Sequence, residues 1–328
     1  MNLRRRFVEL SLRRMNIDRW AVVYLLASAF YPILKPSVFP SPLTYSALHV
    51  LVAGAVWILP PLLRGSRWFV ARLLGEVYLP LLFPIFYAEL EYLGLIFFDF
   101  EKSLDPSLIS LEEWIFGYQP SLEWSRAWPW PWFHELMEFA YFSYYFLSAS
   151  FVALVFLARG VAKDQRWNVV RDFVRDLSTT MLICYTLYTI FPAWGPKYFR
   201  AGYVEVGGWF FTHIMLHIHE HAALLGAAFP SSHVAGSLIP WWYTWRWFPR
   251  HRWWMTTLFV LLCMSTVYNR YHYVVDVMAG LLLGWIVLLV GSDLGDTARE
   301  FLERRRLADR FKRAGQLVRR KPRSGNRG

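Results

Sequence analysis

The stretch AFPSSHVAG at positions 228–236, followed further along by NRYHYVVD at positions 269–276, decides the interpretation of the whole chain. Pro230 suits the first turn of a helix, because its fixed φ is already helical and it has no N–H group to satisfy. The amides of Ser231 and Ser232 beside it would then point outward at the positive end of the helix dipole. The first stretch therefore predicts an anion-binding site at the start of an apolar helix.

The second stretch places an imidazole next to a carboxylate. His272 and Asp276 are four residues apart, so on a helix they share one face, where the carboxylate can hold the imidazole in one tautomer and orientation. Arg270 adds a positive charge two residues before His272. Together with His233 at the predicted helix start, this set favours phosphoryl transfer through a phosphohistidine.

The composition indicates a membrane protein built from helices. The 328 residues are 56% hydrophobic and 19% aromatic, whereas roughly 45–50% apolar residues are usual in a soluble domain. Cys184 and Cys263 lie inside apolar runs, where they are expected to be small buried hydrophobes, and no disulfide is inferred. The net charge of +11 comes from arginines and lysines at the two ends and in short loops. That distribution is typical of cytoplasmic loops rather than of a nucleic-acid surface, so no nucleic-acid partner is expected.

We predict an all-α, polytopic membrane helical bundle with about eight transmembrane helices. Each predicted span approaches the roughly 20 residues that a bilayer requires. The spans are about 20–34, 45–63, 77–98, 135–157, 173–191, 230–247 (or from Ala223), 254–267 and 273–290. They lie within one transmembrane domain, residues 20–292, which contains an acidic extracytoplasmic loop at 99–133. A basic cytoplasmic segment, 1–19, precedes this domain, and a basic cytoplasmic tail, 293–328, follows it.

Eight spans with both termini inside place every strongly basic connection in the cytoplasm. The same count brings Lys197, His233, Arg270, His272 and Asp276 to the extracytoplasmic face. Ionisable groups at membrane depth are costly and usually functional. Each could singly be an interfacial anchor, but as a set they predict one shared phosphate site. We expect an integral protein of a bacterial inner membrane.

Several other polar residues allow two interpretations. Glu89 and Glu91 either form hydrogen bonds within the bundle or help to bind an acceptor. Residues His134, Glu135 and Glu138, at the start of the fourth span, could line the cavity of the site.

The histidines at positions 213, 217, 219 and 221 allow either a metal site or a loop or short helix that roofs the site. The spacing after His217 suits no single helix face and no cysteine joins the cluster, so no metal is expected.

These stretches resemble the type-2 phosphatidic acid phosphatase superfamily. Its second signature, Pro-Ser-Gly-His, is similar to the sequence at positions 230–233, and His272 and Asp276 fall in register with its third signature, as does Ser265. Thr266 stands where that signature has an arginine. The first signature is not intact, and Lys197, in Gly-Pro-Lys, is its nearest counterpart.

The departures look like the inositol phosphorylceramide synthase branch, which is often described as inositolphosphotransferase-like. A Gly-Pro-basic segment and a Tyr-His-Tyr-x-x-Asp motif recur there, and the acidic segment at positions 111–121 is also similar. The resemblance covers about residues 80–290 and implies a six-helix core like that of the superfamily.

The resemblance implies a set of roles. His272 attacks the phosphorus, Asp276 orients His272, and His233 protonates the leaving oxygen. The phosphate oxygens are held by Lys197, Arg270 and the amides of Ser231 and Ser232. No metal or other cofactor is required in this scheme.

The sequence is compatible with three alternative functions. The protein is a lipid phosphotransferase, a lipid phosphate or polyprenyl pyrophosphate phosphatase, or a noncatalytic phospholipid binder or transporter. The expected partners are a lipid substrate and the bilayer. The His272 and Asp276 pair favours an enzyme, because binding alone needs positive charge but no oriented nucleophile. The donor lipid, the acceptor and the oligomeric state are left open.

The predicted topology can be tested with a reporter fused after Gly328. We expect a cytoplasmic signal, because eight spans that begin inside also end inside. A periplasmic signal would contradict the span count.

Overall fold

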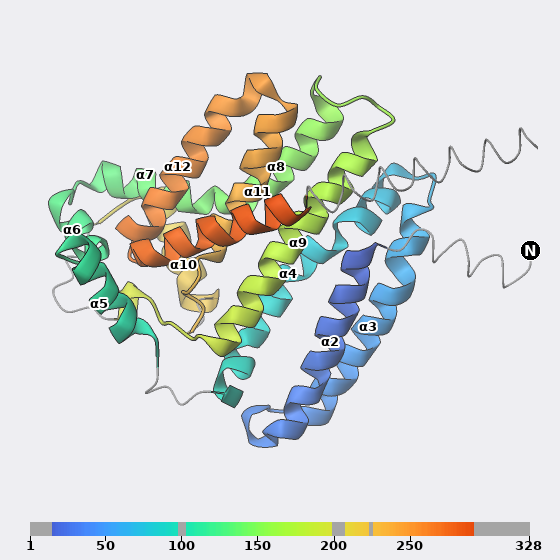
Figure 1. Ribbon diagram of the computed structural model, residues 1–328, viewed down its shortest axis with the longest axis horizontal. Helices are drawn as coiled ribbons and strands as arrows, with labels where there is room; N and C mark the ends of the chain where they lie inside the picture. The colour runs from blue at the N-terminus through green and yellow to red at the C-terminus, as the bar shows by residue number, and fades with distance from the viewer. Residues whose placement is uncertain (1–14, 98–102, 199–206, 223–225, 292–328) are drawn as a thin grey trace, which may run out of the picture. The chain divides into compact units, whose positions relative to one another are not determined.

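The structure is a computed structural model that describes residues 15–97, 103–198, 207–222 and 226–291. Within these residues the regular elements are helices (Figure 1), and an isolated bridge joins Ala193 to Ala227. The predicted all-α class is therefore confirmed. The N-terminal segment up to residue 14, part of the outer loop (98–102) and the tail from residue 292 lie outside the described residues.

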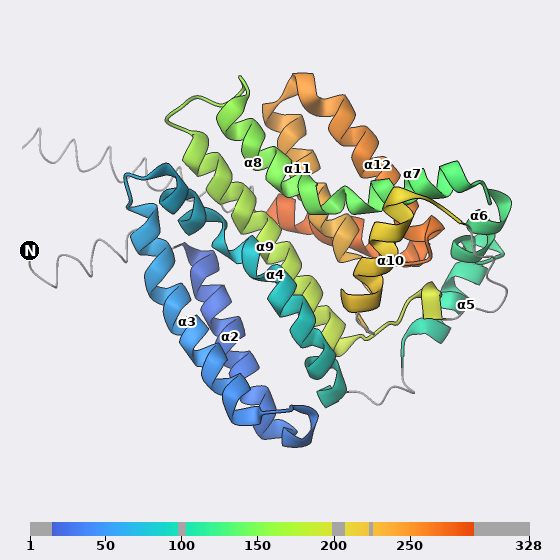
Figure 2. The same ribbon diagram turned by 180° about the vertical axis from the view of Figure 1, so that it is seen from behind.

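The long helices follow the predicted spans. They are α2 (Asn16–Leu34), α3 (Pro42–Arg64), α4 (Phe69–Phe97), α7 (Pro131–Phe142), α8 (Tyr144–Leu157), α9 (Arg166–Ile190), α11 (Ser232–Trp247), α12 (Arg252–Tyr268) and a final helix, Val274–Gly291. Three shorter helices lie outside the predicted spans: α5 (Asp105–Phe116), α6 (Pro120–Ala127) and α10 (Phe210–Ala222). Figure 2 shows the hairpin of α2 and α3 beside α4 and α9; both helices of the hairpin contact α4, and α2 also contacts α9.

By length and apolarity, four described helices can cross a membrane: α2, α3, most of α4 and the final helix. The pair of α7 and α8 would be a fifth span. The other three predicted spans form helices in the expected places but are too short or too charged for this criterion. With 16 and 17 residues, α11 and α12 are short, and α9 carries five charged residues, at positions 166, 171, 172, 175 and 176. The structure thus supports a helical membrane bundle with four to five clear spans.

The predicted fourth span is broken. Helices α7 and α8 meet at Ser143 with a bend of 52°. The Ser143 hydroxyl donates a hydrogen bond to the Ala140 carbonyl at 2.6 Å, which is a bond of the kind that bends helices. As a result, Tyr141 and Tyr144, on either side of the break, both face His233, with ring centroids 4.6 and 4.4 Å away.

A buried ion-pair network joins four helices. Arg64 of α3 donates from Nη2 to Oδ1 of Asp18 at 2.8 Å and lies 3.3 Å, through Nε, from Oε2 of Glu76. Arg171 of α9 donates to the same Glu76 at 2.7 Å. Asp18 is fully buried and belongs to α2. This helix begins at Asn16, before the predicted boundary at residue 20. Paired charges of this kind can remain at membrane depth, where single charges are very costly.

The final helix approaches the start of α11 closely because it presents glycines there. A Cβ atom at Gly280 would lie 2.5 Å from the Ser231 carbonyl oxygen, and one at Gly284 would lie 2.7 Å from Cδ2 of Leu238. Small residues four apart are a common device for close helix contact in membranes. This contact holds together the two stretches that carry His233 and His272.

We expect Gly280→Ala to destabilise the protein by about 1–3 kcal/mol, because the added methyl overpacks a tight contact. Gly54→Ala in α3 is the matched control, since a Cβ there meets nothing within 4 Å. Thermal unfolding of both variants in the same detergent measures the difference. Equal melting temperatures would show that the helix contact yields without cost.

Candidate active site

His272 lies in the turn between α12 and the final helix rather than on a helix. The amide of His272 donates to the Thr266 carbonyl at 2.9 Å, and its Nδ1 lies 2.8 Å from the Ala228 carbonyl oxygen. Because a carbonyl oxygen can only accept, Nδ1 carries a proton, so the lone pair of the uncharged ring is on Nε2. The turn therefore selects the tautomer in which Nε2 is the nucleophilic nitrogen.

Asp276 lies beside His272 but does not form its closest hydrogen bond. Oδ2 of Asp276 is 3.6 Å from Nδ1 of His272 and accepts the Tyr273 amide at 2.8 Å. The sequence predicted that both residues share a helix face, whereas the helix starts only at Val274. The Asp276 side chain caps that helix start, so the Ala228 carbonyl orients the imidazole, and Asp276 supplies a nearby negative charge.

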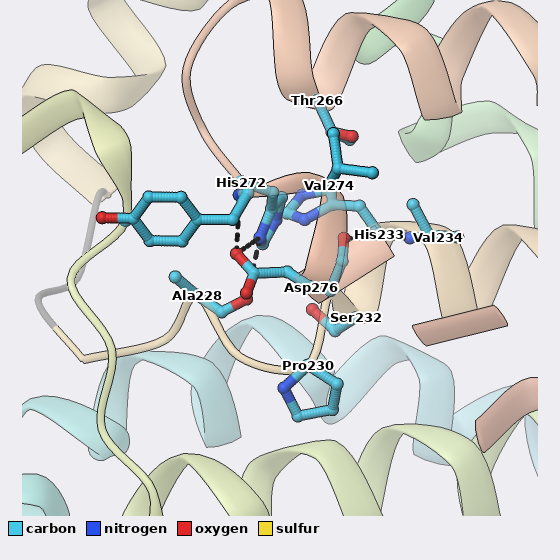
Figure 3. Close-up of polar contacts among 12 residues, drawn as sticks. Ala228, Pro230, Ser232, His233, Val234, Thr266, His272, Val274 and Asp276 are labelled. Carbon is cyan, nitrogen blue, oxygen red and sulfur yellow. Dashed lines mark hydrogen bonds and ion pairs between the residues drawn. The ribbon is translucent and has the colours of Figure 1, made fainter. Parts of the chain in front are cut away.

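His233 stands in the first turn of α11, facing His272. The centroids of the two imidazoles are 5.8 Å apart, and Figure 3 shows His272 close to both Asp276 and His233. Nε2 of His233 is 3.0 Å from the hydroxyl of Tyr141. One phosphoryl group could contact both imidazoles in this arrangement.

The amides predicted to bind phosphate are directed at protein acceptors. Helix α11 begins at Ser232, with Ser231 as its N-cap and Pro230 just outside the helix. The Ser231 amide donates to the Asp276 backbone carbonyl at 3.0 Å, and the Ser232 amide donates to the Tyr188 hydroxyl at 3.0 Å. These two amides thus tie the loop together, which the sequence pattern did not reveal.

The two predicted cations lie in different surroundings. Lys197, in the short helical turn Pro196–Tyr198, places Nζ 5.9 Å from the ring centroid of Tyr271, on the border of the site. Arg270 has a left-handed backbone with φ of 61°, and its Nε and Nη2 donate to the Ser125 hydroxyl of α6 at 3.1 and 2.8 Å. Arg270 therefore anchors the turn of His272 to the outer segment.

Two tyrosines, which the sequence analysis does not assign to the site, and one carboxylate complete it. The Tyr271 hydroxyl donates to Glu138 at 3.1 Å, and Tyr271 and Tyr141 have ring centroids 4.4 Å apart. Glu138 is only 5% exposed. It was predicted as a possible lining residue, and the signal for the tyrosines was the run YFSYYF at 141–146 inside an apolar span.

The histidine cluster at positions 213–221 lies on α10, which covers the site as a short helix. His219 stacks on Tyr271 with ring centroids 4.2 Å apart, whereas His213 and His217 are exposed. Burial, together with the nearby positive charge of Lys197, lowers the pKa of His219 to about 4, so this imidazole is neutral at pH 7. Within the described part of the chain, no group of three or more histidine, cysteine or acidic side chains is arranged to hold a metal ion.

Comparison with known proteins places this chain in a family. The family model described as PAP2 superfamily matches residues 106–290, which include both stretches of the site. The chain belongs to the PAP2 superfamily. It is 25% identical over 176 residues to a PA-phosphatase related-family protein of Dictyostelium discoideum, and the match covers 48% of this chain and 32% of that relative. The chain thus spans about a third of the length of the curated relative it matches, and no solved structure matches significantly. Assignment to the inositol phosphorylceramide synthase branch stays a prediction.

In this PAP2 protein a second carboxylate, Glu112 of α5, reaches the start of the final helix. Its Oε1 accepts the amide of Val274, and the side chain is fully buried. Burial is the main reason that the pKa of Glu112 rises from 4.5 to about 7, and the nearby charge of Asp276 raises it further, against the lowering effect of the Val274 and Val275 amides. Glu112 therefore titrates near neutral pH.

We expect the stability of the protein to depend on pH through Glu112. A raised pKa means that the folded protein holds this proton more tightly than the unfolded chain does. The resulting stabilisation is fully present below about pH 4.5 and is lost as the pH rises through about 7. Between pH 5 and pH 8 the unfolding free energy of the wild type should fall by on the order of 2 kcal/mol relative to Glu112→Gln, which cannot titrate but keeps an acceptor.

Melting temperatures in detergent across this pH range test the expectation. Glu113→Gln, at the exposed neighbouring position of α5, is the control and should follow the wild-type curve. Parallel curves for the wild type and Glu112→Gln would contradict the assignment.

Proposed function

We propose that this PAP2 superfamily member is an integral membrane enzyme that transfers a phosphoryl group from a lipid phosphate or phospho-head-group substrate through a phosphohistidine on His272. Membership of the superfamily suggests a lipid phosphatase-type activity. The observation that carries the proposal is the hydrogen bond from Nδ1 of His272 to the Ala228 carbonyl. It favours the tautomer with the lone pair on Nε2, and a second imidazole lies nearby, with ring centroids 5.8 Å apart, which suits nucleophilic catalysis at phosphorus.

In the first step, Nε2 of His272 forms a bond to phosphorus while the bond from phosphorus to the leaving oxygen breaks. His233 donates a proton to that oxygen. Asp276, 3.6 Å from Nδ1, balances the positive charge that develops on His272, and Lys197 balances the charge of the phosphate oxygens. In the second step, water or an alcohol gives its proton to His233 and its oxygen bonds to phosphorus, while the bond from phosphorus to Nε2 breaks and neutral His272 is restored.

This scheme needs no metal or nucleotide, because a histidine supplies the nucleophile and a lysine supplies the positive charge. Of the groups predicted to bind phosphate, Lys197 keeps that role in our proposal. The amides of Ser231 and Ser232, and Arg270, hold the surrounding loops through the contacts described above.

We propose that the site opens on the extracytoplasmic side of a bacterial inner membrane, with both termini in the cytoplasm. Residues 20–292 would form the catalytic membrane domain, 99–133 its outer segment, and 1–19 and 293–328 basic cytoplasmic extensions. A transferase with an alcohol acceptor is our first choice, in line with the resemblance of the Tyr-His-Tyr-x-x-Asp motif to inositolphosphotransferase-like enzymes. The alternative is a phosphatase that uses water.

The two alternatives differ in their products. Purified protein in detergent is incubated with phosphatidic acid, polyprenyl pyrophosphate or phosphatidylinositol, with and without ceramide or diacylglycerol. Free phosphate without an acceptor identifies a phosphatase, and an acceptor-dependent new phospholipid identifies a transferase. Intact protein that binds these lipids but converts none of them would be a noncatalytic binder or transporter.

We expect His272→Ala and His233→Ala each to lower turnover by about 10²–10⁴-fold or more, because each variant removes a group that acts in the transition state. A phosphoramidate survives base and is lost in acid, so labelled enzyme quenched in alkali should retain phosphate in His233→Ala and not in His272→Ala. His251→Ala, in the turn before α12, is the control and should behave like the wild type. Near-full activity of either site variant would refute the roles assigned here.

A further inference from the structure

Asp105, at the start of α5 in the outer segment, is a buried carboxylate that accepts three hydrogen bonds. Oδ2 accepts the Trp194 amide at 2.7 Å, and Oδ1 accepts the Gly195 amide at 2.8 Å and the Tyr273 hydroxyl at 2.9 Å. The residue has no exposed surface. An ionised carboxylate at such a position is costly unless its partners are well placed.

The three donors come from the two segments that matter most to the proposed reaction. Trp194 and Gly195 lie three and two residues before Lys197, and Tyr273 directly follows His272. The phosphate-binding lysine and the nucleophile are therefore connected through one shared acceptor. Among the described residues the backbone of Ala228 also bonds to both segments, whereas Asp105 joins them through a single side-chain carboxylate.

The same two segments are also in close backbone contact. Gly195 has a positive φ of 89°, and a Cβ atom there would lie 2.8 Å from the Tyr271 carbonyl oxygen. The Ala228 amide donates to the Ala193 carbonyl at 3.0 Å, while the Ala228 carbonyl accepts from His272. A small displacement of the turn that carries Lys197 would therefore also displace His272.

Apolar packing also supports this contact, but it does not fix the position of one segment relative to the other. Tyr273 and Ala193 belong to a buried cluster with Leu108 of α5. Such a cluster would hold the segments together without the carboxylate. Three donors that converge on two oxygens instead fix the position of each backbone, and an asparagine would turn an N–H group toward one of these donors.

We propose that Asp105 is a positioning residue, whose carboxylate sets the place of the Lys197 turn relative to His272 so that a phosphate held by Lys197 is presented to Nε2. The inference rests on the proposed function, in which Lys197 binds phosphate and His272 attacks it. It gives the outer segment a part in catalysis rather than only in covering the membrane domain.

A double-mutant cycle tests the coupling, with Asp105→Asn, Lys197→Met and the double variant. If Asp105 acts through Lys197, Asp105→Asn should lower kcat/KM by about 10²-fold in the wild-type background, as a misplaced reacting group does. In the Lys197→Met background it should have little further effect. Losses that simply multiply would overturn the proposal.

A second readout does not depend on turnover. Inorganic phosphate binding to the four proteins, followed by tryptophan fluorescence or calorimetry, should weaken by about tenfold on Asp105→Asn when Lys197 is present and not when it is replaced. A purely structural Asp105 would lower the melting temperature and leave the phosphate affinity of the folded fraction unchanged, which would also overturn the proposal.

Glu123→Gln is the matched control, because this carboxylate of the outer segment is exposed and accepts a hydrogen bond from nearby Arg126 at 2.8 Å. It should change neither readout. If Asp105→Asn does not fold, Tyr273→Phe replaces it in the cycle, because this variant keeps the two hydrogen bonds from amides to Asp105. The expected loss in kcat/KM is smaller, and it should again disappear in the Lys197→Met background.

The two readouts separate this inference from the proposed function. Phosphate binding that follows the predicted cycle in a protein that converts no lipid would uphold Asp105 as a positioning residue and refute the enzyme. Lipid conversion by the wild type, combined with losses in the two single variants that multiply in the double variant, would uphold the enzyme and refute the positioning role of Asp105. A wild type that neither binds phosphate nor converts lipid would refute both.

Discussion

The hydrogen bond between Nδ1 of His272 and the carbonyl of Ala228 is the interaction on which the site depends. It joins the loop before α11 to the turn before the final helix, and it sets the tautomer of the imidazole at the same time. The two segments joined by this bond also meet where the final helix packs against the start of α11, and a Cβ atom at Gly280 would lie 2.5 Å from the Ser231 carbonyl oxygen. Close packing between two helices thus supports the bond that selects the tautomer.

Three buried carboxylates gather around the start of the final helix: Asp105, Glu112 and Asp276. Each accepts at least one N–H or O–H group from residues 273–274, so the exposed donors of the helix start and the positive end of its dipole offset much of the cost of burial. Glu112 still keeps a raised pKa, because burial outweighs its hydrogen bonds. The acidic outer segment is therefore part of the site and not a solvated loop.

The sequence predicted what depends on local spacing and on apolar runs. Helices formed where the spans were expected, and His233, His272 and Asp276 came together because each lies in or next to the first turn of a helix, in a recognisable sequence pattern. The break at Ser143 was missed, since a serine inside an apolar run carries no signal of its own. The hydrogen bonds of the Ser231 and Ser232 amides and the direction of Arg270 were missed as well, because they depend on Tyr188, Asp276 and Ser125, which are distant in sequence.

Asp276 shows why a residue can be found by pattern while its role is not. Its spacing from His272 suggests a carboxylate that grips the imidazole, yet its Oδ2 caps the helix at the Tyr273 amide and its backbone carbonyl accepts the Ser231 amide. At 3.6 Å from Nδ1, its charge is felt by His272 through a buried, weakly screening medium. In the proposed mechanism, that effect is small while the imidazole is neutral and grows as the bond from Nε2 to phosphorus makes the ring positive. Asp276 would then stabilise the transition state more than the resting site, which is the difference that accelerates a reaction.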